Sequence, residues 1–519
     1  MKKKYQMLAL LLSMLMMLSL LGGCSKNAAG ETTGSQNAGT AGKTDVTMGI
    51  CVSLASLEPM TAFTREEQYV IANVFDTLFE LKDGEYVGEL ATEFEMSEDL
   101  KSISCTLRDD VYFHNGEKLT ASDVAYCFNN LGNFSFWANN AGYIDHAEAI
   151  DDTHVVIYGT QPNVFLMNVV SNIEIANEKA VTELGDEHKW APVGTGAYRL
   201  VSYDKVDTIK LELNEDYFKW DELGVPPIKN VTYKVFAEET AMANALEAGE
   251  IDMVSKLGTN YAENFKDNAD YTVNYLSSDG VYLVLYNCGA EPFNNKLVRQ
   301  AIGYALDRDS LNMIVSNGTN EPWDYFYSVA QAGAPDYDAL PHYSYDPEKA
   351  KELLTEAGYP DGISLDPMPI MESEQNYAVA VQSQLKEVGI NFEIEILEQN
   401  TLFDRIFAMD YQILCFSLST EIYDMSYNCN YFKSAPYKTM MFPCGDWGTD
   451  ELDKLITQAE TTTDIEARKD LYTQIYTILF DEQPMTATLQ SQTSIVRKAG
   501  LDYSRPNELK VLIQNLSWK

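Results

Sequence analysis

The chain has 519 residues, of which 78 are acidic and 37 are lysine or arginine, so its formal net charge is −41. A surface with this much negative charge repels phosphate backbones, and we therefore expect no nucleic-acid partner. The length exceeds what a single compact core usually takes, which predicts two or three lobes.

The first predicted element is an apolar segment at 7–21, which follows three lysines and leads through two glycines to Cys24. A basic start, a short apolar centre and a small-residue exit are typical of a secretory signal peptide. A cysteine directly after two small residues resembles the bacterial lipoprotein signal. That resemblance implies a signal peptide at 1–23, cleavage before Cys24 and a lipid on the Cys24 thiol. The alternative is an ordinary secretory peptide with an incidental cysteine.

Residues 24–44 are mostly Ser, Gly, Ala, Thr, Asn and Gln, a composition that cannot bury a core. We expect a flexible tether here, long enough to hold a folded body clear of lipid headgroups. The folded sequence begins near Asp45, and the apolar run at 46–57 predicts a strand. No later stretch approaches 18 consecutive apolar residues, so we expect no further membrane crossing.

Helices and strands alternate irregularly along the rest of the chain. The two-residue alternation at 102–108 predicts a half-exposed strand, and Thr120 to Asp123 predicts a capped helix start. The strongest helix pattern is 346–358, where Asp346 can accept the first backbone N–H groups and Gly358 can end the helix. A further helix is predicted at 377–389 and a strand at 391–397. This alternation predicts mixed α/β lobes.

Four pieces of the sequence, in this order along the chain, together carry a resemblance to a known family. The first piece contains Asn115, where members of that family usually have aspartate. The pieces lie at 107–124, at 193–198 with 214–218, at 245–252, and at 298–308. Together they resemble the bacterial extracellular solute-binding proteins of family 5, the peptide/nickel class, which feed ABC importers.

The resemblance implies a periplasmic-binding-protein-like fold of type II, with two hinged α/β lobes and an extra domain, as in class C binding proteins. It also implies capture of short peptides in an interlobe cleft, delivery to an ABC permease and its ATPase, a monomeric chain and no cofactor. The implied lobes are 45–73, 189–283 and 491–519 for the first, 74–188 for the extra domain, and 284–490 for the second.

The segment at 416–425 is the predicted ligand contact. In peptide-binding relatives the matching stretch carries a tryptophan and then an aspartate that pairs with the ligand's ammonium group. The resemblance places Leu418 at the tryptophan and Glu421 at the aspartate, with Ser419 and Thr420 between them. A carboxylate at 421 can still neutralise an amine in a desolvated cleft. The alternative is a surface loop whose Glu421 is only solvated.

A second predicted contact is Phe63, which follows the loop at 58–62. In relatives the residues after the proline of this loop line the cleft, so Phe63 is expected to offer an apolar surface. Packing within the first lobe explains Phe63 equally well.

Other chemistry is weakly supported. The Gly194-Thr195-Gly196 run lacks the Gly-Lys-Ser/Thr ending of a phosphate loop, which favours a structural turn. His114 lies in a turn-like Phe-His-Asn-Gly sequence and the other histidines are scattered, so we expect no metal site. The chain has no G-x-S-x-G or H-E-x-x-H motif, and we expect no enzyme activity.

Seven cysteines remain besides Cys24, and none forms a CxxC pair, so a zinc site is not expected. The odd number means that at least one thiol stays free or pairs between molecules. A local disulfide between Cys429 and Cys444 is one pairing that the spacing allows.

The ligand class has alternatives. The same fold is compatible with a nickel chelate, haem, an opine or an oligosaccharide, and a lipid-anchored receptor that signals is a further reading. An exported hydrolase would need a catalytic constellation that the sequence does not contain. In every case we expect an exported protein at the cell membrane, facing outward or, with an outer membrane, facing the periplasm.

Overall fold

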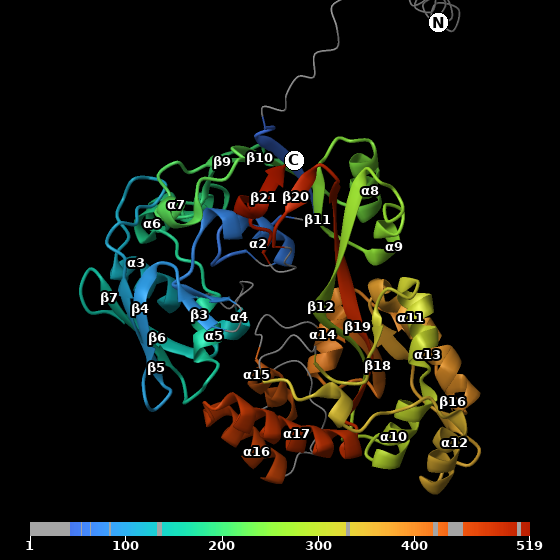
Figure 1. Cartoon of the computed structure of the whole chain (residues 1–519). Coiled ribbons are helices and arrows are strands. Elements are labelled where there is room, and N and C mark those ends of the chain that lie inside the picture. The colour runs from blue at the N-terminus through green and yellow to red at the C-terminus, as the bar shows by residue number, and fades with distance from the viewer. Residues whose placement is uncertain are drawn as a thin grey trace, which may run out of the picture. The chain divides into compact units, whose positions relative to one another are not determined.

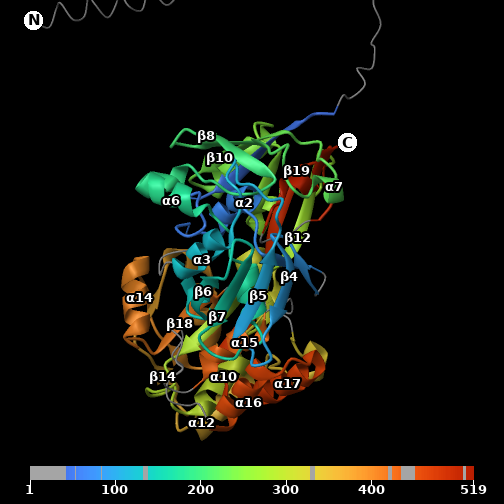
Figure 2. The same cartoon turned by 90° about the vertical axis from the view of Figure 1, so that its left-hand side faces the viewer.

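A computed structural model of the chain describes residues 42–52, 54–62, 64–82, 85–131, 138–327, 333–418, 424–433, 450–505 and 510–519. They belong to one compact unit, Gly42–Lys519, and many of its elements are labelled in Figures 1 and 2. The predicted signal peptide, Cys24 and most of the predicted tether lie outside the described residues. Within that described part, no helix is both long and apolar enough to span a bilayer.

One nine-stranded mixed sheet runs through the unit, in the order β18-β12-β19-β11-β1-β10-β9-β8, with β13 on β19. Its strands are β1 (Asp45–Cys51), β8 (Tyr198–Tyr203), β9 (Thr208–Leu213), β10 (Asn230–Phe236), β11 (Met253–Leu257), β12 (Tyr271–Tyr286), β13 (Glu321–Pro322), β18 (Ile413–Leu418) and β19 (Met485–Lys498). The long antiparallel strands β12 and β19 run from the region of α8 and α9 to that of α10 and α11 (Figure 1).

A separate four-stranded antiparallel sheet has the order β4-β5-β7-β6, made of β4 (Ala91–Met96), β5 (Ser102–Leu107), β6 (Ile144–Ala149) and β7 (His154–Gly159). Four two-stranded sheets pair β2 (Phe79–Lys82) with β3 (Glu85–Gly88), β14 (Ile363–Ser364) with β16 (Ile390–Asn391), β15 (Met368–Ile370) with β17 (Ile394–Ile396), and β20 (Leu501–Tyr503) with β21 (Leu516–Trp518).

The helices of the first half are α2 (Arg65–Val74), α3 (Ala121–Asn129), α4 (Ala138–Ala141), α5 (Leu166–Ser171), α6 (Glu178–Leu184), η1 (Gly185–Trp190), α7 (Trp220–Leu223), α8 (Glu239–Glu247) and α9 (Thr259–Ala262). Those of the second half are α10 (Lys296–Ala305), α11 (Arg308–Ser316), η2 (Tyr337–Ala339), α12 (Pro347–Glu356), η3 (Glu372–Glu374), α13 (Gln375–Glu387), α14 (Gln399–Phe407), α15 (Met425–Cys429), η4 (Asn430–Phe432), α16 (Asp450–Thr461), α17 (Ile465–Glu482) and η5 (Ile513–Asn515).

Two large hydrophobic cores lie along the long strands. The first core is built around β1, α2, α3 and the four-stranded sheet, and Leu276 of β12 packs against it. The second core is built around α10 to α13 and α17, and it begins on β12 at Val281. On β19, Ile495 belongs to the first core and Leu489 to the second. The same two strands therefore cross from one core to the other.

The strongest local predictions are confirmed. Thr120 caps α3 with a capping box to Asp123, and Asp346 caps α12 by accepting the Lys349 N–H at 2.9 Å. Gly358, beyond the end of α12, has φ +97°, in the left-handed region that glycine tolerates best. The strand predicted at 102–108 is β5, and α13 covers the helix predicted at 377–389 apart from its last two residues.

Two predicted strands differ from the structure. The strand predicted at 46–57 ends at Cys51. The Ser56 N–H instead donates to Glu67 Oε1 at 2.9 Å, so this backbone is bound to the start of α2 rather than to a neighbouring strand. The strand predicted at 391–397 is split into β16, which pairs with β14, and β17, which pairs with β15. Between them Gln382 Nε2 donates to the Phe392 carbonyl at 2.6 Å. The predicted lobe and domain boundaries stay a prediction.

Candidate functional site

The predicted ligand-contact segment begins at the end of β18, the terminal strand of the large sheet. Leu418 lies opposite Val281 of β12, at the point where β12 enters the second core, and its side chain is half-buried against that core. The β12–β19 register shifts between Ser277 and Val281, just before this point. The structure therefore places Leu418 where the crossing strands pass between the two cores.

The other predicted contacts stay predictions. The structure describes Cys429, which is buried, but not its suggested disulfide partner. The predicted site residues outside the described part of the chain are Phe63, Ser419, Thr420, Glu421 and Cys444.

Near the end of that segment the chain is anchored by a buried ion pair. Asp424 caps α15 by accepting the Ser426 N–H at 2.9 Å, and it pairs with Arg468 of α17. Arg468 Nη2 also donates to the Tyr472 hydroxyl at 3.0 Å. Burial alone would lower the pKa of Arg468, but the charges of Asp424 and Tyr472 and the hydrogen bonds to them together raise it. The pair therefore fixes α15 to α17.

The sequence analysis assigned no role to Asp424 or Arg468. Asp424 lies within the predicted segment, and an Asp before a short helix is a recognisable N-cap signal. Its pairing with Arg468 joins residues 44 positions apart, which no sequence spacing indicates.

Helix α15 and the turn after it contact the first core. Tyr427 of α15 makes edge-type ring contacts with Tyr143, at 6.1 Å between centroids, and with Phe165, at 6.4 Å. Asn430 Nδ2 donates to the Tyr143 hydroxyl at 3.4 Å. We call this contact, made by Tyr143 and Phe165 with Tyr427 and Asn430, the core–core contact. It joins segments almost 290 residues apart in the chain.

A backbone hydrogen bond also crosses this region, and several buried polar atoms here have no hydrogen-bond partner within the described part of the chain. The Val164 N–H donates to the Glu460 carbonyl at 2.8 Å. Three buried atoms here have no hydrogen-bond partner among the described residues: Asn163 Nδ2, Asn430 Oδ1 and Glu460 Oε1. Buried amide and carboxylate groups without partners are costly, so they are suited to bind water or the polar groups of a solute.

The crossing strands are held closely together beside Leu418. Gln490 Nε2 donates to the Ser278 carbonyl at 3.2 Å, and Ser491 Oγ donates to the Gly280 carbonyl at 3.0 Å. A Cβ atom at Gly280 would clash with the Ser491 hydroxyl, so the close approach depends on glycine.

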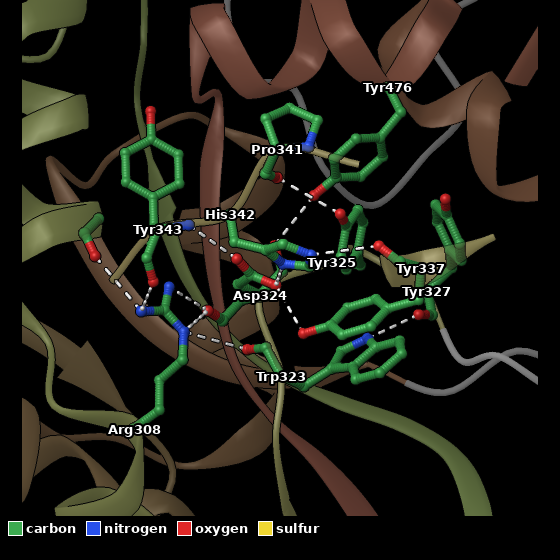
Figure 3. A network of polar contacts seen from close by, with 12 residues as sticks. Arg308, Trp323, Asp324, Tyr325, Tyr327, Tyr337, Pro341, His342, Tyr343 and Tyr476 are labelled. Carbon is green, nitrogen blue, oxygen red and sulfur yellow. Dashed lines mark hydrogen bonds and ion pairs between the residues drawn. The ribbon is translucent and has the colours of Figure 1, made fainter. Parts of the chain in front are cut away.

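A polar network supports the second core at the same strands (Figure 3). Arg308 is buried and donates to the Ala487 carbonyl of β19 at 3.0 Å and to the Trp323 and Tyr343 carbonyls at 3.2 Å each. Asp324 accepts from the Tyr337 hydroxyl at 2.9 Å and the Tyr343 N–H at 2.8 Å, and it faces His342 Nδ1 at 3.1 Å. The network ties β19 to the segment between β13 and α12.

The glycine-rich run packs closely against the end of α2. The Gly196 N–H donates to the Val74 carbonyl at 2.9 Å, and Thr195 Oγ1 donates to Asp76 Oδ2 at 2.6 Å. A Cβ atom at either glycine would clash with the Val74 backbone. His114 Nε2 faces the Gly196 carbonyl at 2.9 Å, and burial lowers the pKa of His114 to about 4. Within the described residues, no group of three metal-ligating side chains lies together.

The chain is similar in sequence to a known family of bacterial binding proteins. A sequence model of the bacterial extracellular solute-binding proteins, family 5, middle region, matches residues 85–439. The glutathione-binding protein GsiB of Pectobacterium atrosepticum is 28% identical over 370 residues, which cover 68% of this chain and 69% of that protein. The oligopeptide-binding protein AppA of Bacillus subtilis is 26% identical over 439 residues, which cover 77% of this chain and 78% of that protein.

A solved structure has the same architecture. The ABC transporter substrate-binding protein CtaP of Listeria monocytogenes matches with a TM-score of 0.79, at 20% sequence identity, over 92% of this chain and 99% of that one. At this identity the likeness shows a shared fold.

Proposed function

Because the chain belongs to the bacterial extracellular solute-binding proteins of family 5, we propose that it captures short peptides for an ABC importer. The fold is the type II periplasmic-binding-protein fold that the sequence motifs predict. The observation that carries the proposal is the family match across 85–439, supported by relatives named for binding glutathione and oligopeptides.

Capture follows from two cores joined by crossing strands. In an open form the solute reaches the strands, and closure forms contacts that exist only when the cores meet. The core–core contact of Tyr143 and Phe165 with Tyr427 and Asn430 supplies such contacts. A permease can then distinguish closed from open molecules. No chemical step on the solute is part of the proposal.

Recognition of a peptide backbone has support in the sheet. Among the described strands, β18 is terminal and is paired on one side only, with β12. A terminal strand offers backbone N–H and C=O groups to an added strand, with side chains left to wet, tolerant pockets. The unpartnered Asn163, Asn430 and Glu460 atoms suit the same polar ligand.

Glu421 is proposed to neutralise the peptide's ammonium group, next to Leu418. The chain is further proposed to be lipidated on Cys24, anchored to the membrane and exposed outside the cell or in the periplasm. It is proposed to act as a monomer that delivers its solute to a permease and ATPase.

Calorimetric titration with di- to hexapeptides tests the proposal. We expect binding by purified protein, and we expect Glu421→Gln and acetylation of the peptide amine to weaken it equally, by roughly 10- to 100-fold, without adding to each other. Absence of binding by every peptide would contradict the proposal. Mass spectrometry of solute retained through native purification then identifies the cargo, and it reveals a nickel chelate, haem, opine or oligosaccharide directly.

A further inference from the structure

Glu374, at the end of η3, is a buried carboxylate that has no countercharge among the residues that the structure describes. Its residue is 9% exposed. Among the residues that the structure describes, none forms an ion pair or a hydrogen bond with its carboxylate. Burying an ionised carboxylate without a partner lowers the stability of the folded protein. A positively charged partner would offset that loss.

The position of Glu374 is at the crossing between the cores. The turn η3 lies against β18, and the charge of Glu374 is felt by Tyr282 of β12 and Cys415 of β18. Tyr282 lies opposite Ser417, the residue before Leu418. Glu374 is therefore a neighbour of the strand end at which the ligand-contact segment begins.

The titratable groups that face Glu374 are Tyr282, Cys415 and Tyr377, and their pKa values lie far above neutral pH, unlike that of Glu374. Burial raises the pKa of Tyr282 to about 12, and it raises the pKa values of Cys415 and of Tyr377 on α13 well above their ordinary range. Burial likewise raises the pKa of Glu374, to about 7, with no opposing charge to lower it. Near neutral pH both the protonated and the ionised form of Glu374 are therefore within reach.

We propose that Glu374 pairs with a positively charged group of the captured solute, an ammonium or guanidinium beyond the terminal amine, so that the protein prefers cationic peptides. The inference rests on the proposed function, because it takes a peptide as the solute. An incoming cation supplies the missing countercharge and drives Glu374 to its ionised form. Binding of a cationic peptide therefore releases a proton, which binding of a neutral one does not.

The test compares three tripeptides by calorimetry near pH 7: Ala-Lys-Ala, its Nε-acetyl-lysine analogue, and Ala-Ala-Ala. We expect Ala-Lys-Ala to bind about tenfold more tightly than the acetylated analogue. Titrations in two buffers of different ionisation enthalpy should show that Ala-Lys-Ala releases a larger fraction of a proton than Ala-Ala-Ala, since the terminal amine contributes equally to both. The affinity for Ala-Lys-Ala relative to that for Ala-Ala-Ala should rise between about pH 6 and pH 8, because titration of the terminal amine cancels in the ratio.

The variants Glu374→Gln and Glu372→Gln remove the same charge from the same turn, but Glu372 is exposed. We expect Glu374→Gln to abolish both the lysine preference and the extra proton release, and Glu372→Gln to keep both. Equal affinity for the lysine and acetyl-lysine peptides, or extra proton release that persists in Glu374→Gln, would overturn the inference while leaving Ala-Ala-Ala binding and the proposed function intact. If none of the three peptides binds, both the proposed function and this inference are contradicted.

Discussion

Arg308 donates hydrogen bonds to backbone carbonyls from separate stretches of the second core, including Trp323, Tyr343 and Ala487. Burial lowers the pKa of its guanidinium, although the charge of Asp324 acts in the opposite direction. Replacing Arg308 by Met leaves several buried carbonyl oxygens without donors. We expect Arg308→Met to lower the free energy of unfolding by about 3 kcal/mol, measured by urea denaturation.

Arg199 is the matched control for Arg308. It lies on β8 and pairs with Glu212 where both side chains are more than two-fifths exposed. Because exposed ion pairs contribute little, Arg199→Met should cost less than about 1 kcal/mol. Equal losses for the two variants would mean that the Arg308 network does not support the second core.

The buried Glu58 and the half-buried His188 form a pair whose strength depends on pH. His188 Nε2 lies 3.3 Å from Glu58 Oε2, and the other ring nitrogen faces the Gly185 carbonyl. The hydrogen bond to Glu58 raises the pKa of His188 above its ordinary value of 6.5. The charged form is thus favoured in the folded state. This stabilisation is complete below pH 6.5 and is lost as the pH rises through the higher folded-state pKa.

We therefore expect the wild-type protein to lose its stability advantage over His188→Gln as the pH is raised from about 6 to about 8. Urea denaturation at each pH measures the difference between the two proteins, in which other titrating groups cancel. His154, which pairs with Asp151 at the exposed surface, supplies the control variant His154→Gln. A constant difference between wild type and His188→Gln over this range would contradict the assigned pairing.

Helix α12 shows which elements the sequence can predict. Its cap, its proline at the first turn and its terminating glycine are all local, so the pattern at 346–358 is sufficient to place it. The single strand predicted at 391–397 is wrong because the break within it depends on contacts distant in the sequence. It breaks where its pairing changes from β14 to β15, and there the Gln382 side chain reaches the Phe392 carbonyl from the neighbouring helix. A contact of that kind leaves no periodic trace in the sequence.

The N-cap of α12 gives a test at the level of one helix. Asp346→Ala removes the acceptor for the Lys349 N–H and should lower the free energy of unfolding by about 1 kcal/mol. Asp346→Ser keeps an acceptor and should restore most of that loss. Thermal or urea denaturation of both variants measures the effect. A Ser variant as unstable as the Ala variant would show that the cap hydrogen bond is not the cause.

The functional region is the part of the molecule that the sequence predicts least completely. The motif order identifies the family, and the segment at 416–425 points to the end of β18. The core–core contact, however, joins Tyr143 to Asn430 across 287 positions. The crossing of β12 and β19 likewise depends on a register that only the folded sheet fixes. Such pairings follow from tertiary topology, so one sequence without coordinates cannot reveal them.

The Val164 amide reports whether the two cores are in contact, since it donates to the Glu460 carbonyl across the same region. Tyr427→Ala removes the ring that packs against Tyr143 and Phe165. We expect this variant to speed hydrogen exchange at Val164 by about tenfold, because opening there costs less once the ring is gone. Added peptide should slow exchange at Val164 in the wild-type protein, since binding favours the closed form.

The Ile175 amide, which donates to the Asp76 carbonyl at 2.9 Å within the first core, is the internal control. Neither Tyr427→Ala nor peptide should change its exchange, because both ends of that hydrogen bond stay on the same side of the crossing strands. Equal acceleration at Val164 and Ile175 would mean that Tyr427→Ala loosens the first core as a whole. If peptide binds tightly and yet leaves exchange at Val164 unchanged, capture does not depend on the core–core contact, and closure must be sought elsewhere along β12 and β19.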